Sequence, residues 1–381
     1  MKILFCATHY SLNTGYAEVA CRIINYLAEQ GHTIYYVAIQ SPPNPATDRS
    51  LNANVHVLEQ EEFGYENVLA YNQAFRPDVI LVYSDVVVCA HYVNKLKTVD
   101  KTFKLILYQD ITYKWQNYIP HLNSLADKFV CFNKFWESHL VEMGVSADKI
   151  TTIEHPVEVP EEVCQPSTDD FIVLNFNRNT YRKRLDITID GFIKFFLRNN
   201  CDPSLKLFIK WSDEDKSGIN VRNTAVALAR DNGLNDEQTE TLMNKSIIGH
   251  TGYDLNSEEV WEIYMMGHVG INTSSGEGFG LCSINHQLCG RPQILSDIGT
   301  NRELFNKDWC TLLPIRSRIM LSKSDDNVGG MQELVSSDDV AEAIDFYYKN
   351  PEIRERHGSI GQQYFHAKES PLAKWNKTIR H

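Results

Sequence analysis

Glu277 is a carboxylate set inside a glycine-rich turn, in the sequence SSGEGFGL at residues 274–281. A short apolar stretch with helical spacing follows, so the turn stands at the amino end of a predicted helix. Gly278 and Gly280 leave room for a ligand to approach the backbone, and first-turn amides attract anions. A carboxylate beside them can accept hydrogen bonds from hydroxyls. The pattern predicts a ligand with both hydroxyls and phosphates, such as a sugar nucleotide, although a tight turn with a helix-capping glutamate also fits.

Basic residues crowd the start of a second predicted helix, in the sequence NFNRNTYRKRLDI at residues 175–187. Cations there oppose the helix dipole, typically by about 0.3–1 kcal/mol each, and a bound anion would offset that cost. A solvated basic turn is the alternative for this stretch alone. Two anion-suited helix starts in one half of the chain favour a ligand. The basic residues are Arg178, Arg182, Lys183 and Arg184.

Alternating strand and helix patterns must position these two turns. Apolar runs bounded by polar loops predict buried strands, and amphipathic stretches such as residues 15–30 predict helices. Such alternation indicates parallel sheets covered on both faces. In the first half we expect strands at residues 2–7, 32–39, 55–58, 79–83, 105–108, 129–132 and 151–153, with further helices at 66–75 and 135–143.

A proline-rich, acidic stretch at residues 155–170 interrupts the alternation, which then resumes. We expect strands at 171–174, 205–209, 247–248, 269–272 and 293–295, with helices at 185–198, 219–244, 257–266, 337–349 and 353–367. Residues 316–336 show no clear pattern and are expected to form a mobile loop. The predicted organisation is a Rossmann-like domain at 1–157, a linker at 158–170, a second domain at 171–358, and a C-terminal helix at 359–381 that packs back toward the first domain.

The composition is that of an ordinary globular protein, with 43% apolar and 23% charged residues among 381. A formal net charge of −12 argues against broad binding to nucleic acid or anionic membranes. The nine cysteines include no CxxC pair, which favours reduced, buried thiols over a zinc site. No apolar run has the length of a signal peptide core or a membrane span. We therefore expect a cytoplasmic protein.

The two turns together resemble the signature of the retaining glycosyltransferases of the GT-B fold, family 4 type. That signature joins an Arg, a Lys five residues later, and a distant Glu-x-Phe-Gly turn. This chain has Arg178, Lys183 and the tetrapeptide Glu277-Gly278-Phe279-Gly280. The stretch NFNRNTYRKRLD at residues 175–186 also resembles, more weakly, glycosyltransferases of large DNA viruses. Further segments that match the family's pattern are 249–275, 289–304, Gly15 and 30–34.

The resemblance implies an α/β protein in which two doubly wound Rossmann-like domains face each other across a cleft. Arg178, Lys183 and Glu277 would be the catalytic residues, with the two cations on the donor diphosphate and Glu277 on the sugar hydroxyls. The departing phosphate would deprotonate the acceptor, so no metal is expected. Donor-binding residues would include Gly278, Phe279, Gly280, Leu281, Asn285, Gly252 and Tyr253; Gly15, Gln109, Asp110 and His9 would lie on the acceptor side of the cleft.

Three positions depart from the family pattern. Asn285 stands where a glutamate would grip the ribose, and its amide can accept one such bond but carries no charge. Gln109-Asp110 replaces a His-Asp pair; it can hydrogen-bond a sugar hydroxyl but cannot transfer a proton. The paired glycines of the first loop are reduced to Gly15-Tyr16, which leaves less room beside the acceptor.

The expected reaction moves a hexose from a nucleoside diphosphate to an acceptor hydroxyl on a glycan or a protein. GDP-mannose is slightly favoured over UDP-linked glucose or N-acetylglucosamine. Nucleic acid is not an expected partner, and the oligomeric state stays open, a homodimer included.

Rival interpretations remain at this point. Asp213-Glu214-Asp215 matches the Asp-x-Asp of metal-dependent GT-A transferases. Gly276-x-Gly278 with Asp297 begins an NAD-binding fingerprint, but Leu281 stands where the third glycine should be. A sugar-nucleotide-binding protein without turnover, or an epimerase of the same fold, would carry the same turns.

Overall fold

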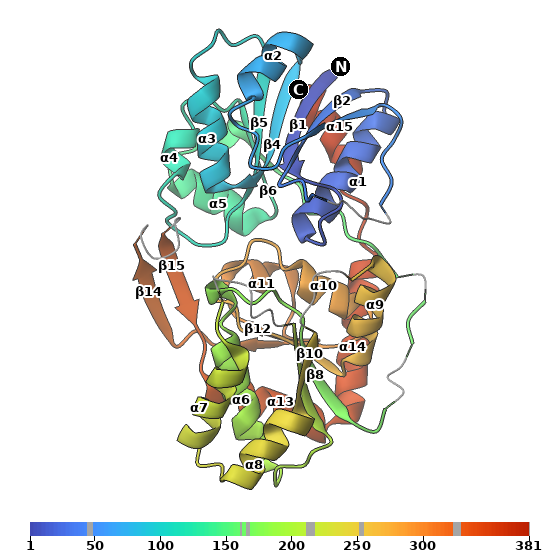
Figure 1. Cartoon of the computed structure of the whole chain (residues 1–381), viewed down its shortest axis with the longest axis vertical. Helices are drawn as coiled ribbons and strands as arrows, with labels where there is room; N and C mark the ends of the chain where they lie inside the picture. The colour runs from blue at the N-terminus through green and yellow to red at the C-terminus, as the bar shows by residue number, and fades with distance from the viewer. Residues whose placement is uncertain are drawn as a thin grey trace. The chain divides into compact units, whose positions relative to one another are not determined.

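The computed structural model describes residues 1–43, 49–160, 162–164, 168–210, 218–250, 255–322 and 329–380. The chain forms two compact units, each built on its own sheet (Figure 1). The first unit contains Met1–Val157, Met320–Met331 and Glu369–His381. The second contains Glu158–Ile319 and Gln332–Lys368. The predicted α/β architecture of two doubly wound sheets is confirmed.

The first unit has a seven-stranded parallel sheet in the order β3-β2-β1-β4-β5-β6-β7. Its central strands are buried along nearly their whole length, as continuous apolar runs require when helices cover both faces. The strands are β1 (Lys2–Thr8), β2 (Thr33–Ile39), β3 (Val55–Glu59), β4 (Val79–Asp85), β5 (Lys104–Asp110), β6 (Lys128–Cys131) and β7 (Ile150–Thr152). The helices are α1 (Gly15–Glu29), α2 (Val68–Phe75), α3 (Val86–Leu96), α4 (Ile119–Leu122), α5 (Lys134–Glu142) and α15 (Leu372–Arg380), with a 3₁₀ turn at Ala147–Lys149.

The second unit has a six-stranded parallel sheet in the order β10-β9-β8-β11-β12-β13. Its strands are β8 (Phe171–Asn175), β9 (Leu205–Lys210), β10 (Ile247–His250), β11 (Val269–Asn272), β12 (Gln293–Ser296) and β13 (Thr311–Leu313). Its helices are α6 (Leu185–Arg198), α7 (Val221–Asp231), α8 (Asp236–Thr241), α9 (Ser257–Met266), α10 (Leu281–Leu288), α11 (Gly299–Leu304), α13 (Ser337–Lys349) and α14 (Pro351–His366), with a 3₁₀ turn at Tyr181–Lys183 and a π-helical turn at Leu242–Ser246.

The core of the second unit lies where α6 and α13 pack on one face of this sheet. The buried stripe of α6 carries Phe192, Phe195 and Phe196, none of which is exposed. On α13, Ile344 and Tyr347 are equally buried. This packing fixes α6, and therefore the basic turn that precedes it.

Two elements differ from the sequence predictions, and α3 (Val86–Leu96) is one that was not predicted. Residues 316–336 are not a patternless loop, because β14 (Ser317–Leu321) and β15 (Gly330–Leu334) form a two-stranded sheet. The apolar run after β4 is a separate helix, α3, capped by the carboxylate of Asp85 on the amides of Val87 and Val88.

The C-terminal segment 359–381 is likewise not one helix, since α14 ends at His366 and α15 begins at Leu372. Figure 1 shows α15, in red, beside α1 within the first unit. There the buried Trp375 packs edge-on against Tyr108, with ring centroids 4.8 Å apart.

Candidate active site

The strand order of the second unit reverses between β8 and β11, and the space outside the carboxyl ends of these two strands is called the crevice below. The chain runs β8, β9, β10 toward one edge of the sheet and then returns to β11 on the other side of β8. In open α/β sheets, ligands bind at this point of reversal, outside the carboxyl ends of the strands. The loop after β8 carries the basic turn, and the loop after β11 carries the glycine-rich turn. The topology thus brings together the two stretches that the sequence singled out.

Hydrogen bonds join the two loops directly. The backbone N–H and side-chain hydroxyl of Ser275 both donate to the carbonyl of Arg182, at 2.9 and 3.1 Å. Thr273 donates to the carbonyl of Arg184 at 2.9 Å and shares a 2.7 Å hydrogen bond with Thr188 of α6. The basic turn is therefore fastened to the glycine-rich turn through its backbone as well as through side chains.

Glu277 and Lys183 form a buried ion pair between these loops. The Lys183 ammonium donates to Glu277 Oε2 at 2.5 Å, and Arg182 Nη1 donates to Oε1 at 3.1 Å. Asn272, the last residue of β11, adds a bond to Oε2 at 3.2 Å. Burial alone would raise the pKa of Glu277, but Lys183 and Arg182 outweigh it and hold that pKa at about 2. The carboxylate is charged at every physiological pH.

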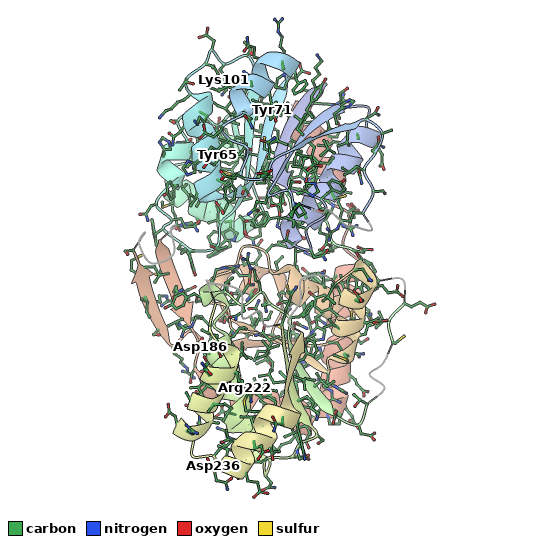
Figure 2. The ribbon with its side chains drawn as sticks, viewed as in Figure 1. Tyr65, Tyr71, Lys101, Asp186, Arg222 and Asp236 are labelled. Carbon is green, nitrogen blue, oxygen red and sulfur yellow. The ribbon has the colours of Figure 1, made fainter. Side chains whose placement is uncertain are left out.

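Arg182 is the member of this cluster that the sequence analysis did not select as a site residue. It stands beside Lys183 among four basic residues, and nothing in the sequence distinguishes the four. The structure distinguishes them. Arg184 pairs with Asp186 at the start of α6, with 2.5 Å between Nη2 and Oδ2; Asp186 is labelled in Figure 2. Arg178 is exposed.

The glycine-rich turn ends at Gly280, the residue before α10. Gly280 has φ of +85°, a left-handed conformation that favours glycine. Ser283 N makes the first hydrogen bond of the helix, to the Gly280 carbonyl at 3.0 Å. The amides of Leu281 and Cys282 precede it and have the donor geometry of an anion-binding helix start.

Three buried amide oxygens accompany these donors. The Oδ1 atoms of Asn177, Asn285 and Asn301 are buried and have no hydrogen-bond partner within the part of the chain that the structure describes. Asn177 follows β8, Asn285 lies on α10, and Asn301 lies on α11, where its Oδ1 is 3.8 Å from the place that a Cβ on Gly280 would take. A buried acceptor without a donor is costly, so these atoms suit a ligand that brings hydroxyl or N–H groups.

Site candidates of the first unit gather at the carboxyl end of β5. Tyr16, in the first turn of α1, donates to Asp110 Oδ2 at 2.7 Å. Burial, together with the charges of Asp110 and Asp85, raises the pKa of Tyr16 well above its ordinary value. Gln109 precedes Asp110 on the strand, so its side chain lies on the opposite face of the sheet. It is buried, and neither of its amide atoms has a partner among the described residues.

Gly15 is the first residue of α1 and directly precedes Tyr16. His9, the remaining candidate of the first unit, contacts other residues of that unit. Its Nδ1 accepts from the backbone N–H of Ser11 at 3.1 Å, and its Nε2 lies 2.8 Å from Glu59 Oε2. Burial lowers the pKa of His9 against the opposing influence of Glu59. The ring is fully buried between Ser11 and Glu59, so a ligand that reached His9 would have to displace one of these two residues.

Some sequence candidates lie outside the described residues. They are Gly252 and Tyr253 of the donor-binding set and the acidic triplet Asp213-Glu214-Asp215. Within the described ranges, no group of three or more His, Cys, Asp or Glu side chains is arranged to hold a metal ion. In the same ranges, no helix has the length and apolar character needed to cross a membrane.

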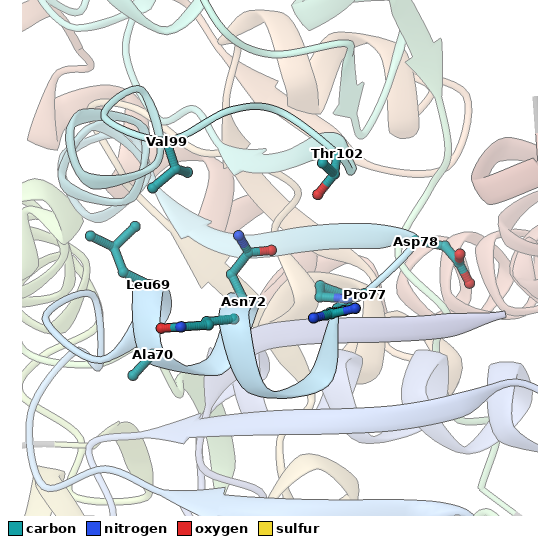
Figure 3. A pocket seen from close by; sticks show the side chains of 9 residues that line it. Leu69, Ala70, Asn72, Pro77, Asp78, Val99 and Thr102 are labelled. Carbon is teal, nitrogen blue, oxygen red and sulfur yellow. The ribbon is translucent and has the colours of Figure 1, made fainter.

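A surface hollow of about 720 Å³ lies elsewhere on the first unit, between α2 and the segment before β5 (Figure 3). Pro77 and Asp78 precede β4, and Thr102 precedes β5, so the hollow opens at the amino ends of these strands. That edge is opposite to the one where doubly wound sheets bind ligands. We do not assign it to the active site.

Comparison with solved structures identifies the architecture. No protein-family model and no curated protein matches the sequence. HepE of Anabaena, solved in complex with UDP and glucose, superposes with a TM-score of 0.65 at 15% identity, over 100% of this chain and 98% of HepE. Sucrose-phosphate synthase of Thermosynechococcus elongatus gives 0.66 at 14% identity, over 99% and 96%. The lipopolysaccharide outer core galactosyltransferase WaaB gives 0.66 at 14% identity, over 100% and 99%.

These neighbours and the two parallel sheets define the class: the protein has the GT-B fold. The similarity extends over essentially the whole chain and agrees with the fold that the sequence motifs implied. At 13–17% identity it establishes the fold and leaves the donor and acceptor open.

Proposed function

We propose that the protein is a retaining glycosyltransferase that moves a hexose from a nucleoside diphosphate sugar to an acceptor hydroxyl. One observation carries the proposal. At the crevice between β8 and β11, charged donors suited to phosphates and buried acceptors suited to hydroxyls occur together. A sugar nucleotide has both kinds of group. A dinucleotide fingerprint would need a glycine where Leu281 starts α10.

The chemistry requires little covalent participation by the protein. The bond from the anomeric carbon to the diphosphate breaks, a bond to the acceptor oxygen forms, and the acceptor proton passes to the departing phosphate. Lys183, Arg178 and the first amides of α10 would stabilise the charge that develops on that phosphate. Glu277 would accept hydrogen bonds from sugar hydroxyls through the oxygens that now face Lys183 and Arg182. No metal ion is needed in this scheme.

We propose a UDP-linked hexose as the first donor to test. HepE has been solved with UDP, with UDP-glucose, and with UDP and glucose, and TarM of S. aureus with UDP. The ligands of these structures give no information on GDP-mannose, which the sequence analysis slightly favoured. GDP-mannose is therefore tested as well. The first unit would hold a glycan or protein acceptor. The nine unpaired cysteines support a reducing, cytoplasmic location.

The test is calorimetric titration with UDP-glucose, UDP-N-acetylglucosamine, GDP-mannose and ADP-glucose. We expect one of these donors to bind. We also expect Glu277→Gln to reduce the affinity for that sugar nucleotide more than the affinity for the corresponding free nucleoside diphosphate. NMR of the product formed from the preferred donor should show a retained anomeric configuration. Failure of every donor to bind would end the proposal, and binding without transfer or hydrolysis would leave a sugar-nucleotide-binding protein in its place.

A further inference from the structure

Trp115 is a bulky residue of the first unit that is held in a strained backbone conformation. Its φ is +64°, a left-handed value that is unfavourable for residues with a Cβ atom and most unusual for a large side chain. Trp115 lies in the loop after β5, at the carboxyl edge of the first sheet. Tyr16 and Asp110 lie at the same edge, where doubly wound sheets bind ligands. Backbone strain that is kept at such an edge points to a binding role.

Hydrogen bonds on both sides of Trp115 hold this conformation. Its backbone N–H donates to Nε2 of His139 at 2.9 Å, and Nδ1 of His139 lies 3.2 Å from Glu142 Oε2. Accepting at Nε2 requires a neutral imidazole, and burial lowers the pKa of His139 in agreement with this. The preceding residue, Lys114, accepts through its carbonyl from the backbone N–H of Met331 at 2.9 Å. The loop therefore presents Trp115 in one fixed position.

The indole ring of Trp115 is accessible, although the residues around it are packed. Trp115 is 43% exposed, whereas Tyr113 and Gln116 of the same loop are buried. The indole stands perpendicular to the ring of His139, with centroids 5.2 Å apart, and His139 in turn contacts Trp136, at 5.8 Å. The ring is thus oriented by packed aromatic neighbours and still offers apolar surface to a ligand.

The surroundings of the ring indicate which ligand could stack on it. Within residues 111–118, all of which the structure describes, the other exposed residue is the polar Asn117. A stable protein interface buries about 800 Å² on each partner, far more than one ring supplies. A sugar ring fits better, because its C–H face packs on an aromatic ring while its hydroxyls bind polar groups. Asp110, at the end of β5, has carboxylate oxygens that can accept from such hydroxyls.

We infer that Trp115 is a stacking platform for a sugar ring of the acceptor, so that the acceptor is a glycan and not an unmodified protein. This inference rests on the proposed function and names the substrate class of its first unit. The strained backbone and the hydrogen bond to His139 fix the indole before the ligand arrives. Little side-chain freedom is then lost on binding, which favours affinity.

The test is titration of the full chain with free trisaccharides, followed by saturation-transfer-difference NMR, with and without added UDP or GDP. The probes are maltotriose, mannotriose and chitotriose, which differ in their sugar. A serine-rich hexapeptide represents a protein acceptor. We expect at least one trisaccharide to bind, with the transferred signal concentrated on ring C–H protons, and we expect the peptide not to bind.

Three variants show whether the ring is responsible. Trp115→Gly removes the ring and also relieves the backbone strain, because glycine adopts a positive φ readily. It should keep the thermal stability of the wild type and bind the trisaccharide about 10- to 30-fold more weakly, as the loss of an aromatic anchor does. Trp115→Phe keeps an aromatic face and should stay within about fivefold of wild type. Tyr364→Ala removes an equally exposed aromatic ring, 42% exposed on α14, and should have no effect.

The outcomes also distinguish this inference from the proposed function. Absence of trisaccharide binding to wild type, binding that Trp115→Gly leaves unchanged, or binding of the peptide alone would overturn the inference. If a hexose is transferred from a sugar nucleotide at a rate that does not depend on Trp115, the proposed function stands and the inference falls. If trisaccharides bind through Trp115 while no sugar nucleotide binds, the glycan platform stands and the proposed function falls.

Discussion

Glu277→Gln should destabilise the second unit, because it removes the buried counter-charge of two cations. The carboxylate accepts from Lys183 at 2.5 Å and from Arg182 at 3.1 Å. Its side chain is 7% exposed and that of Lys183 is 10% exposed, so water cannot replace it. A glutamine of the same shape can accept one of these bonds but cannot balance the charge.

The size of the effect follows from the pKa of Glu277. Folding lowers it from 4.5 to about 2, and each pKa unit corresponds to about 1.4 kcal/mol. The ionised carboxylate therefore contributes roughly 3 kcal/mol to folding, at the lower end of the 3–5 kcal/mol that breaking a buried ion pair costs. Lys183→Met should cost less, since Arg182 still reaches the carboxylate.

The assay is urea unfolding followed by pulsed hydrogen exchange and mass spectrometry of peptides from β11 and α10, which report on the second unit alone. Wild type, Glu277→Gln, Lys183→Met and the double variant form a mutant cycle. We expect the double variant to be no less stable than Glu277→Gln. Lys349→Met is the control, because Lys349 pairs with Asp345 on the surface of α13, where such pairs contribute about 0.3–0.5 kcal/mol.

The pH dependence gives an independent check with a definite sign. In the unfolded chain, Glu277 becomes protonated as the pH falls below 4.5. In the folded chain, its carboxylate stays ionised down to about pH 2. The contribution is therefore complete above pH 4.5 and disappears as the pH falls toward 2. Glu277→Gln should flatten the acid side of the stability profile. Additive costs in the cycle, or an unchanged acid slope, would refute the assignment of a coupled buried pair.

Three further outcomes are expected. Gly270→Ala, in β11, should destabilise by up to about 3 kcal/mol, because its Cβ would lie 2.2 Å from Oε1 of the buried Gln293. Gly233→Ala, with φ of +86° and open space around it, should cost only about 1 kcal/mol in the same urea assay. Tyr16→Phe should cost about 1.5–3 kcal/mol in the first unit by losing its bond to Asp110, seen as faster exchange in α1 peptides. Sugar transfer should proceed unchanged in excess EDTA, and a rate restored only by added Mg²⁺ or Mn²⁺ would contradict the metal-free scheme.

The two loops of the candidate site could be predicted from the sequence because each carries a local signal. Glycines mark the turn that ends at Gly280, whose φ is positive, and the basic run marks the turn before α6. Strand and helix periodicity then predicts the doubly wound order that brings the loops to one crevice. What joins them could not be predicted: Lys183 and Glu277 are 94 positions apart, and their contact depends on the register of β8 and β11.

Other features left no readable pattern. The run VVVCA after β4 has the composition of a strand, and the cap by Asp85 turns it into a helix. In β14 the first four residues, Ser317 to Met320, are all exposed, so no alternation of buried and exposed positions identifies the strand.

Several departures from local physical rules occur together at one edge of the second sheet. Two other helices of this unit, α8 and α9, begin with full capping boxes at Asn235 and Asn256. At the carboxyl ends of β8 and β11, by contrast, Arg184 has φ of +49°, cations stand at a helix start, and three buried asparagine oxygens have no donor among the residues that the structure describes. Each feature costs folding free energy, and a sugar nucleotide would satisfy the charged and polar ones. Single features of this kind also occur elsewhere, such as the positive φ of Gln40 and the buried amide of Gln109. The combination of cations with buried acceptors at one strand edge is therefore the observation that favours ligand binding.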